Sequence, residues 1–289
     1  MPLTTTIPKY VIFTDLDGTL LDRRTYSFEP ALPALRLIRL KSIPLIFSSS
    51  KTRAEIELYR RRLENDHPFI SENGGGVFIP RGYFPFGFPC HRELDRFLMI
   101  ELGTSYLKII DALESIKQET GISLKGFHDL TQKEIASFSG LSQQEVELAK
   151  TREYDEPFLI EGGEKEIGIV RKKIEEKGMN YAWGGKFHHI LGKNDKGKAV
   201  EILKELYENQ FSSIYTIGIG DNLNDLPMLR SVDHPILLEG REDDSREELS
   251  SIQNLTVEEG TGPGCWNEAI LRVIHESGCR RVGRLLKKL

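Results

Sequence analysis

The sequence is organised around one stretch near its start, Tyr10-Val11-Ile12-Phe13-Thr14-Asp15-Leu16-Asp17-Gly18-Thr19-Leu20-Leu21-Asp22. Its first residues are apolar, β-branched or aromatic, which predicts a fully buried strand. Asp15 and Asp17 stand where this strand must end, and two buried carboxylates so close together repel each other unless a cation lies between them. We therefore predict a hard divalent metal ion here, Mg²⁺ bound through oxygen. An EF-hand calcium loop is excluded because Thr19 stands where that loop requires an acidic or amide residue.

Length and charge bound the class of the protein. The chain has 289 residues, of which 39% are hydrophobic, which is enough for two domains. A net charge of −5 gives no overall electrostatic footprint for nucleic acid. The basic run Arg280-Arg281-Val282-Gly283-Arg284-Leu285-Leu286-Lys287-Lys288 is a local exception, which we interpret as the solvated end of a helix.

The compartment follows from the cysteines and from the apolar runs. Cys90, Cys265 and Cys279 are odd in number and form no C-x-x-C pair, so neither a disulfide framework nor a zinc site is indicated. We find no signal peptide at the start and no apolar run of the ~18 residues that a membrane span needs. We expect a cytoplasmic protein that binds neither membrane nor nucleic acid.

A second buried strand, Ile43-Pro44-Leu45-Ile46-Phe47, is followed by Ser48-Ser49-Ser50-Lys51-Thr52 and then by a helix. Small hydroxyls between a strand and the N-terminus of a helix suit a phosphate site. The same residues are also favoured as helix N-caps for stability alone. The residues by themselves leave both interpretations open.

The middle of the chain differs in character from its two ends. A Gly-, Pro- and aromatic-rich segment at 81–90 predicts a crossing between domains. Amphipathic helices and short strands follow, so we predict an inserted α+β cap at 89–189 and a core formed by 1–88 and 190–289. A helix beginning at Lys196 and a buried strand at Ile214–Gly220, which ends at Asp221, return the chain to the core. Gly218-Ile219-Gly220 lacks the third glycine of a dinucleotide fingerprint.

The stretch Asp15-Leu16-Asp17-Gly18-Thr19-Leu20-Leu21 resembles the first motif of the haloacid dehalogenase (HAD) phosphohydrolases. The resemblance implies a doubly wound parallel sheet with the site at the carboxyl ends of its strands. It implies that Asp15 is the nucleophile and that Asp17 is the general acid and base. The later motifs supply Ser49, Lys196, Asp221 and Asp225. The catalytic set is then Asp15, Asp17, Ser49 and Lys196, and the Mg²⁺ ligands are Asp15, Asp17, Asp221 and Asp225.

Within that superfamily the chain is similar to the mannosyl-3-phosphoglycerate phosphatases. The segments that carry this similarity are Ser50–Glu55, Glu72–Gly76, Arg152–Phe158, Trp183–His189, Asn194–Val200 and Gly262–Glu268. It implies hydrolysis of a phosphorylated sugar-glycerate, with a mannosyl or a glucosyl group, to mannosylglycerate or its glucosyl counterpart and phosphate, in compatible-solute synthesis. The substrate contacts we predict are Ser50, Lys51, Arg152, Lys186, His188 and Asn224.

Two alternatives to this function remain at the level of sequence. One is a HAD phosphatase or phosphomutase that acts on another sugar phosphate. The other is a non-catalytic sugar-phosphate-binding protein, which the presence of all four motifs disfavours.

Overall fold

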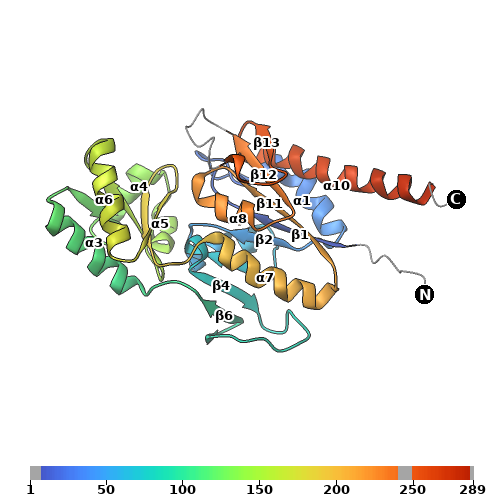
Figure 1. Ribbon diagram of the computed structural model, residues 1–289, viewed down its shortest axis with the longest axis horizontal. Helices are drawn as coiled ribbons and strands as arrows, with labels where there is room; N and C mark the ends of the chain where they lie inside the picture. The colour runs from blue at the N-terminus through green and yellow to red at the C-terminus, as the bar shows by residue number, and fades with distance from the viewer. Residues whose placement is uncertain (1–7, 240–248, 287–289) are drawn as a thin grey trace.

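The computed structural model describes residues 8–239 and 249–286; for residue 239 and residues 276–286 it describes the backbone alone. The first residues of the chain and the side chains of the C-terminal basic run, both discussed above, lie outside this description. The chain forms a large core with a smaller cap at one end of it (Figure 1).

The core is built on one large sheet. Its strands follow the spatial order β13 (Thr256–Glu259), β12 (His234–Glu239), β11 (Ile214–Gly220), β1 (Lys9–Thr14), β2 (Leu45–Ser48), β3 (Phe69–Ser71), β4 (Gly76–Pro80), β6 (Phe97–Glu101) and β5 (Arg92–Leu94). Neighbours from β13 to β3 pair in parallel, whereas β4, β6 and β5 form an antiparallel extension. Because Thr14 is opposite Ile219, the carboxyl ends of β1 and β11 meet at one edge.

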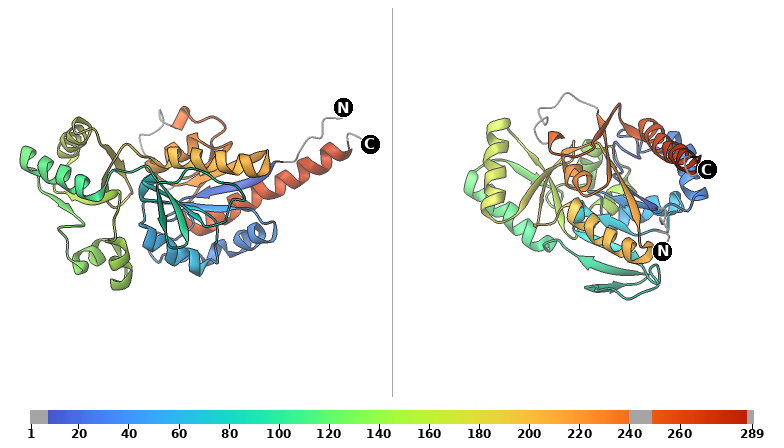
Figure 2. Two further views of the ribbon diagram at one scale, coloured as in Figure 1. Left: turned by 90° about the horizontal axis from the view of Figure 1, so that it is seen from below. Right: turned by 45° about the vertical axis from the view of Figure 1, so that its right-hand side comes forward.

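Helices cover both faces of this sheet (Figure 2). One face packs against α1 (Leu32–Leu40), α2 (Arg53–Arg62) and α10 (Gly262–Leu286), and the other against α7 (Lys196–Phe211) and α8 (Leu226–Arg230). Short 3-10 turns η1 (Glu29–Ala31), η2 (Glu72–Gly74) and η3 (Leu223–Asp225) complete the core. The predicted doubly wound α/β core is confirmed.

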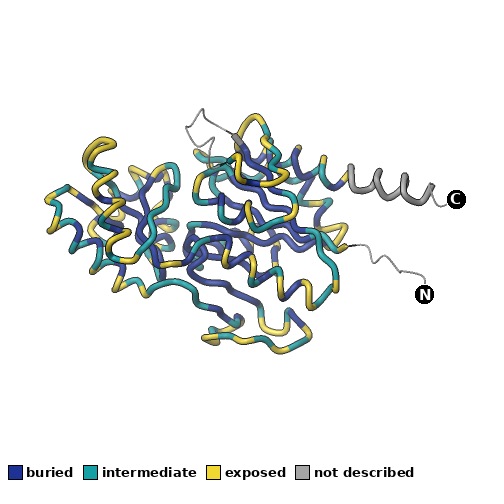
Figure 3. The backbone as a smooth tube through the Cα atoms, viewed as in Figure 1, coloured by how far each residue is buried: buried dark blue, intermediate teal, exposed yellow. Residues whose placement is uncertain are grey.

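The cap has a sheet of its own, in the order β7 (Leu124–Gly126), β8 (Asp155–Ile160), β10 (His188–Leu191) and β9 (Asn180–Trp183), with antiparallel pairing. Helices α3 (Tyr106–Thr120) and α6 (Glu164–Glu176) pack on one side, and α4 (Gln132–Ser139) and α5 (Gln143–Ala149) belong to a second cluster. Buried backbone follows both sheets, whereas the outer turns of the helices are exposed (Figure 3). The cap is therefore an α+β unit with its own apolar interior.

The strand pairing differs from the predicted boundaries of the cap. Residues 92–101 lie in the core sheet, because β6 pairs with β4 along Gly76–Pro80. At the other end, β10 pairs with β8 and β9 as far as Leu191, so the chain returns to the core after that residue. Sequence composition does not reveal pairing with a distant strand, which is why these edges were misplaced.

The aromatic segment at 81–90 is not the inter-domain crossing that we predicted. Phe84 is 5% exposed and its ring lies edge-on to that of Tyr207 in α7, with centroids 5.2 Å apart. The segment thus packs on the core between β4 and β5.

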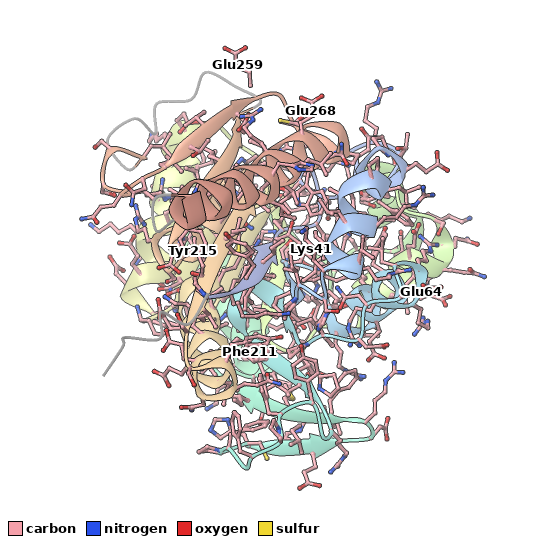
Figure 4. All side chains as sticks on the ribbon, turned by 90° about the vertical axis from the view of Figure 1, so that its right-hand side faces the viewer. Lys41, Glu64, Phe211, Tyr215, Glu259 and Glu268 are labelled. Atoms are coloured by element: carbon pink, nitrogen blue, oxygen red, sulfur yellow. The ribbon has the colours of Figure 1, made fainter. Side chains whose placement is uncertain are left out.

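The end of the core opposite the cap is polar (Figure 4). Lys41 and Glu64, both labelled in this view, are exposed there. Charged side chains in water account for this surface without a ligand.

Tyr154 anchors the cap in the core. It belongs to the cap but is 4% exposed within the core's apolar cluster. A Cβ atom on Gly75 or on Gly103 would collide with Tyr154. The backbone N–H groups of Glu153 and Tyr154 donate to the Glu72 carboxylate, the latter at 2.8 Å. A core turn and a cap segment are therefore interlocked.

We expect Gly75→Ala to destabilise the protein by about 1–3 kcal/mol, because the added methyl group must displace Tyr154 from a close-packed socket. Urea unfolding followed by circular dichroism measures this. Gly87→Ala is the matched control, since a Cβ there meets nothing within 4 Å. Equal stabilities of the two variants would show that the socket is not close-packed.

Candidate active site

A buried ammonium group joins two of the predicted site carboxylates. Lys196, the first residue of α7, donates from Nζ to Asp15 Oδ1 and to Asp225 Oδ1, each at 2.6 Å. Lys196 and Asp225 are fully buried and Asp15 is 6% exposed. Burial raises the pKa of Asp15 well above its ordinary value despite the attraction of Lys196. Burial alone would lower the pKa of Lys196, but the two carboxylates raise it. Lys196 is therefore a fixed cation.

The carboxylates of Asp15, Asp221 and Asp225 form a group that could hold a metal ion. One oxygen from each lies within 4.8 Å of the others. Asp225 Oδ2 also accepts from the backbone N–H groups of Asp221 and Asn222, at 3.0 and 3.1 Å, which folds the loop after β11. Burial, followed by the charge of Asp225, raises the pKa of Asp221 to about 6. Like charges held together in this way, with hard oxygen donors, fit Mg²⁺.

Arg23 and Thr19 are contacts of Asp221 that the sequence analysis missed. Thr19 Oγ1 donates to Asp221 Oδ1 at 2.9 Å, and the guanidinium of Arg23 forms an ion pair with Oδ2. Gly18 makes the turn possible, with φ of +85° and no space for a Cβ atom beside Asp221. The signal in the sequence was Arg23, a basic residue directly after the first motif. Sequence alone does not distinguish an arginine that pairs with a site carboxylate from one that is solvated.

Asp17 is not a member of that group of carboxylates. Its Oδ2 is 2.9 Å from Lys51 Nζ, and Lys51 also lies 3.4 Å from Glu55 Oε1. Burial alone would lower the pKa of Lys51, but these two carboxylates raise it well above its ordinary value. Asp17 Oδ1 is buried and has no hydrogen-bond partner in the described part of the chain. One Asp17 oxygen is thus anchored and the other is free.

The segment after β2 serves as both a helix cap and a wall of the site. Thr52 caps α2 and shares a capping box with Glu55, so the stability interpretation holds for Thr52. Ser49 is 1% exposed, and its Oγ accepts from the backbone N–H of Lys51 at 3.3 Å. Ser49 thus directly follows β2, the strand next to β1, where we predicted a phosphate contact.

A cavity of about 270 Å³ lies between core and cap. The core lines it with Asp17, Arg23, Tyr26, Ser50, Lys51 and Glu55, and the cap with Phe127, Ser139, Leu141, Ala149, Arg152, Pro157, Gly184, Gly185, Lys186, Phe187 and His189. Lysines and arginines outnumber carboxylates in this lining, so the cavity suits an anionic ligand. Its aromatic and aliphatic members give it an apolar side in the cap.

Four predicted substrate contacts, Ser50, Lys51, Arg152 and Lys186, line this cavity, and the two from the cap differ in how far they are already hydrogen-bonded. Arg152 is already engaged, since Nη1 donates to the Ser50 carbonyl at 2.8 Å and Nε donates to the Ala149 carbonyl at 2.9 Å. Lys186 Nζ donates to the Ser139 carbonyl at 2.7 Å. Among the described residues no carboxylate pairs with Lys186, which leaves its charge for a ligand.

Two predicted contacts lie elsewhere. His188 is hydrogen-bonded to the Tyr181 hydroxyl at 2.7 Å and packs on Trp183, and it is not among the described residues that line the cavity. Neighbouring residues of a strand point to opposite faces, so His189 lines the cavity in its place. Asn224 lies in the loop that follows Asp221, and its Nδ2 donates to Asn73 Oδ1 of the core turn Glu72–Gly74 at 3.1 Å.

Comparison with known proteins agrees with this geometry. Residues 12–83 match the haloacid dehalogenase-like hydrolases. A glucosyl-3-phosphoglycerate/mannosyl-3-phosphoglycerate phosphatase of Methanococcoides burtonii is 47% identical over 92% of this chain and 97% of its own length. The chain belongs to this family of HAD phosphatases. A mannosyl-3-phosphoglycerate phosphatase of Pyrococcus furiosus is 37% identical over 85% of this chain and 97% of its own length.

Solved structures share the fold of this chain. A protein of Thermoplasma acidophilum superimposes with a TM-score of 0.64 at 19% identity, covering 94% of this chain and 99% of its own. A HAD subclass IIB sugar phosphatase gives 0.58 at 17% identity, covering 86% of this chain and 94% of its own. No helix in the described residues is long and apolar enough to cross a membrane.

Metal binding by this HAD phosphatase should weaken in acid. A cation binds the ionised form of Asp221, whose pKa is about 6, so protonation competes with Mg²⁺ as the pH falls. We expect the Mg²⁺ dissociation constant, measured by isothermal titration calorimetry, to rise about tenfold or more between pH 7 and pH 5. Asp221→Asn should bind weakly at both values. Equal affinity of the unmutated protein at the two pH values would remove Asp221 from the metal site.

Proposed function

We propose that the protein hydrolyses mannosyl-3-phosphoglycerate and glucosyl-3-phosphoglycerate to the sugar-glycerate and phosphate. The observation that carries this is the pairing of Asp15 with buried Lys196 beside a cavity in whose lining lysines and arginines outnumber carboxylates. The names of the relatives supply the substrate class. The free thiols of Cys90 and Cys265 are consistent with a reaction in the cytoplasm.

Asp15 is the nucleophile in this proposal. Lys196 holds Oδ1, so Oδ2 is the oxygen that attacks phosphorus, and the bond from phosphorus to the glycerate oxygen breaks. Asp17 gives its proton to that leaving oxygen through Oδ1, the atom without a partner. In the second step Asp17 takes a proton from water, the water oxygen attacks phosphorus, and Asp15 is regenerated. Ser49 binds a phosphoryl oxygen.

Lys196 also prepares this site electrostatically, because its charge is held in place before the substrate arrives. Positioning and fixed charge carry most of the catalysis in phosphoryl transfer. The carboxylates of Asp15, Asp221 and Asp225, with the backbone carbonyl of Asp17, would hold Mg²⁺, which when bound neutralises charge on the transferred group.

The sugar-glycerate leaving group occupies the cavity between core and cap. Its carboxylate requires a cation, and Lys186 is available because its bonded partners are carbonyl oxygens. Lys51 stands at the core side of the same cavity, next to Asp17. Arg152, whose donors already serve Ser50 and Ala149, holds the cap wall against the loop after Ser49.

Asp15→Asn should abolish phosphate release from mannosyl-3-phosphoglycerate, because the amide keeps the shape but not the attacking charge. The measurement is a colorimetric phosphate assay with Mg²⁺ present. The melting temperature should be retained. Burial raises the pKa of Asp15 and so disfavours its charge, and removing that charge therefore does not destabilise the fold. Activity within tenfold of the unmutated enzyme would contradict the assignment of the nucleophile.

Lys186→Gln should raise KM for mannosyl-3-phosphoglycerate about fivefold, a modest loss because the ammonium is partly solvated. Hydrolysis of p-nitrophenyl phosphate, which has no carboxylate, should not change. Steady-state kinetics on both substrates gives the comparison. An equal loss on both would place Lys186 in cap closure instead of carboxylate binding.

A further inference from the structure

His189 presents one ring nitrogen to the cavity and the other to a buried carboxylate. Nδ1 lies 2.7 Å from Asp155 Oδ1, and the two residues are 4% and 0% exposed. They lie on neighbouring antiparallel strands of the cap sheet, where His189 of β10 is opposite Pro157 of β8 and Leu191 is opposite Asp155. His189 is also one of the residues that line the cavity. The pair therefore connects the cap interior to the ligand space.

A chain of side chains determines the direction of this hydrogen bond. Asp155 Oδ2 accepts from Asn73 Nδ2 at 2.6 Å, and Asn73 Oδ1 accepts from Asn224 Nδ2 at 3.1 Å. The Asn73 amide thus has its orientation set from both ends. Burial alone would raise the pKa of Asp155, but His189 and Arg152 hold it below its ordinary value. An ionised Asp155 only accepts, so His189 Nδ1 carries the hydrogen.

In the neutral imidazole the opposite nitrogen, Nε2, is then a lone-pair acceptor. Among the described residues it has no hydrogen-bond partner, although the side chain is almost fully buried. Gly184 keeps the space beside it open, because a Cβ atom there would come within 2.8 Å of Nε2. A neutral imidazole with Nδ1–H bonded to a carboxylate binds a hydroxyl donor and not a carboxylate.

We propose that His189 Nε2 accepts a hydrogen bond from a hydroxyl of the hexose, and that Asp155 is the positioning residue that fixes the tautomer required for this contact. The inference rests on the proposed function and deepens it. In a glycosyl-3-phosphoglycerate one glycerate hydroxyl carries the phosphate and the other carries the sugar. The hydroxyl donors of the leaving group are therefore those of the sugar.

Recognition of the leaving group is then divided between two cap residues that line the cavity. Lys186 is charged and binds the carboxylate, whereas His189 is neutral toward the cavity and binds the sugar. Asn73, in the core turn Glu72–Gly74, donates to Asp155, which in turn is hydrogen-bonded to His189. His189 Nε2 is therefore positioned only while the cap packs on that turn. Selection of the sugar is thereby tied to the closed arrangement of core and cap.

Two substitutions at His189 separate its two nitrogens. His189→Asn places an amide N–H near the position of Nδ1 and leaves no acceptor near Nε2. His189→Gln keeps an amide group near the position of Nε2. We expect His189→Asn to raise KM for mannosyl-3-phosphoglycerate roughly tenfold, with kcat for p-nitrophenyl phosphate unchanged. His189→Gln should recover part of that loss.

Asp155→Asn tests the positioning role. Asn73 still donates to the remaining oxygen, so the new amide N–H faces His189 and the ring hydrogen must move from Nδ1 to Nε2. We expect ¹⁵N NMR of the imidazole to report this tautomer change, and KM for mannosyl-3-phosphoglycerate to rise by about as much as in His189→Asn. His128→Asn is the matched control, because His128 is bonded to Glu156 at 2.7 Å in the same cap. It should leave both substrates unaffected.

The outcomes distinguish this inference from the function on which it rests. Unchanged KM for mannosyl-3-phosphoglycerate in His189→Asn, or an equal loss on p-nitrophenyl phosphate, would overturn the sugar contact while the phosphatase activity stands. An Nδ1–H tautomer retained in Asp155→Asn would overturn the positioning role. If the unmutated enzyme hydrolysed p-nitrophenyl phosphate but not mannosyl-3-phosphoglycerate, the proposed function and the inference would fail together.

Discussion

The ammonium of Lys196 between Asp15 and Asp225 is the interaction on which the site depends. A buried charge is tolerated only when it is paired and hydrogen-bonded, and here one cation at the start of α7 serves two carboxylates that follow two different strands. The arrangement requires that β1 and β11 be neighbours in register and that α7 begin at their carboxyl edge. The ion pairs of Lys196 with Asp15 and Asp225 thus require the arrangement of β1, β11 and α7 that the core shows.

The residual like-charge repulsion has a functional meaning. Lys196 supplies one positive charge, whereas Asp15, Asp221 and Asp225 bring three carboxylates into one group. Arg23 and Thr19 contact Asp221 and relieve part of this repulsion in the protein alone. Because burial still raises the pKa of Asp15 and Asp221, the site favours a further cation, and the donor type suits Mg²⁺.

The cap is joined to this site by more than its two connecting segments. Tyr154 is buried in the core cluster, the Glu72 carboxylate accepts from the cap backbone, and Asn73 links Asp155 of the cap to Asn224 of the loop after Asp221. Glu72 is fully buried, and this burial raises the pKa of its carboxyl to about 8. The cavity wall and the chemical site are therefore held in one frame.

Local sequence patterns determined the catalytic core of this protein, because each of its motifs is formed by residues that are close together in the chain. A buried strand that ends in Asp15 and Asp17, a second that ends in Asp221, and a helix that begins at Lys196 can each be recognised from neighbouring residues, and parallel strands bring their carboxyl ends together. Tertiary structure decided the rest. Whether His188 or His189 faces the cavity depends on which side of β10 is covered, and a shift of one residue exchanges the two faces. The partner of Lys51, the contacts of Arg23 and the fate of the 81–90 segment likewise depend on residues far away in the chain, whose approach no local pattern encodes.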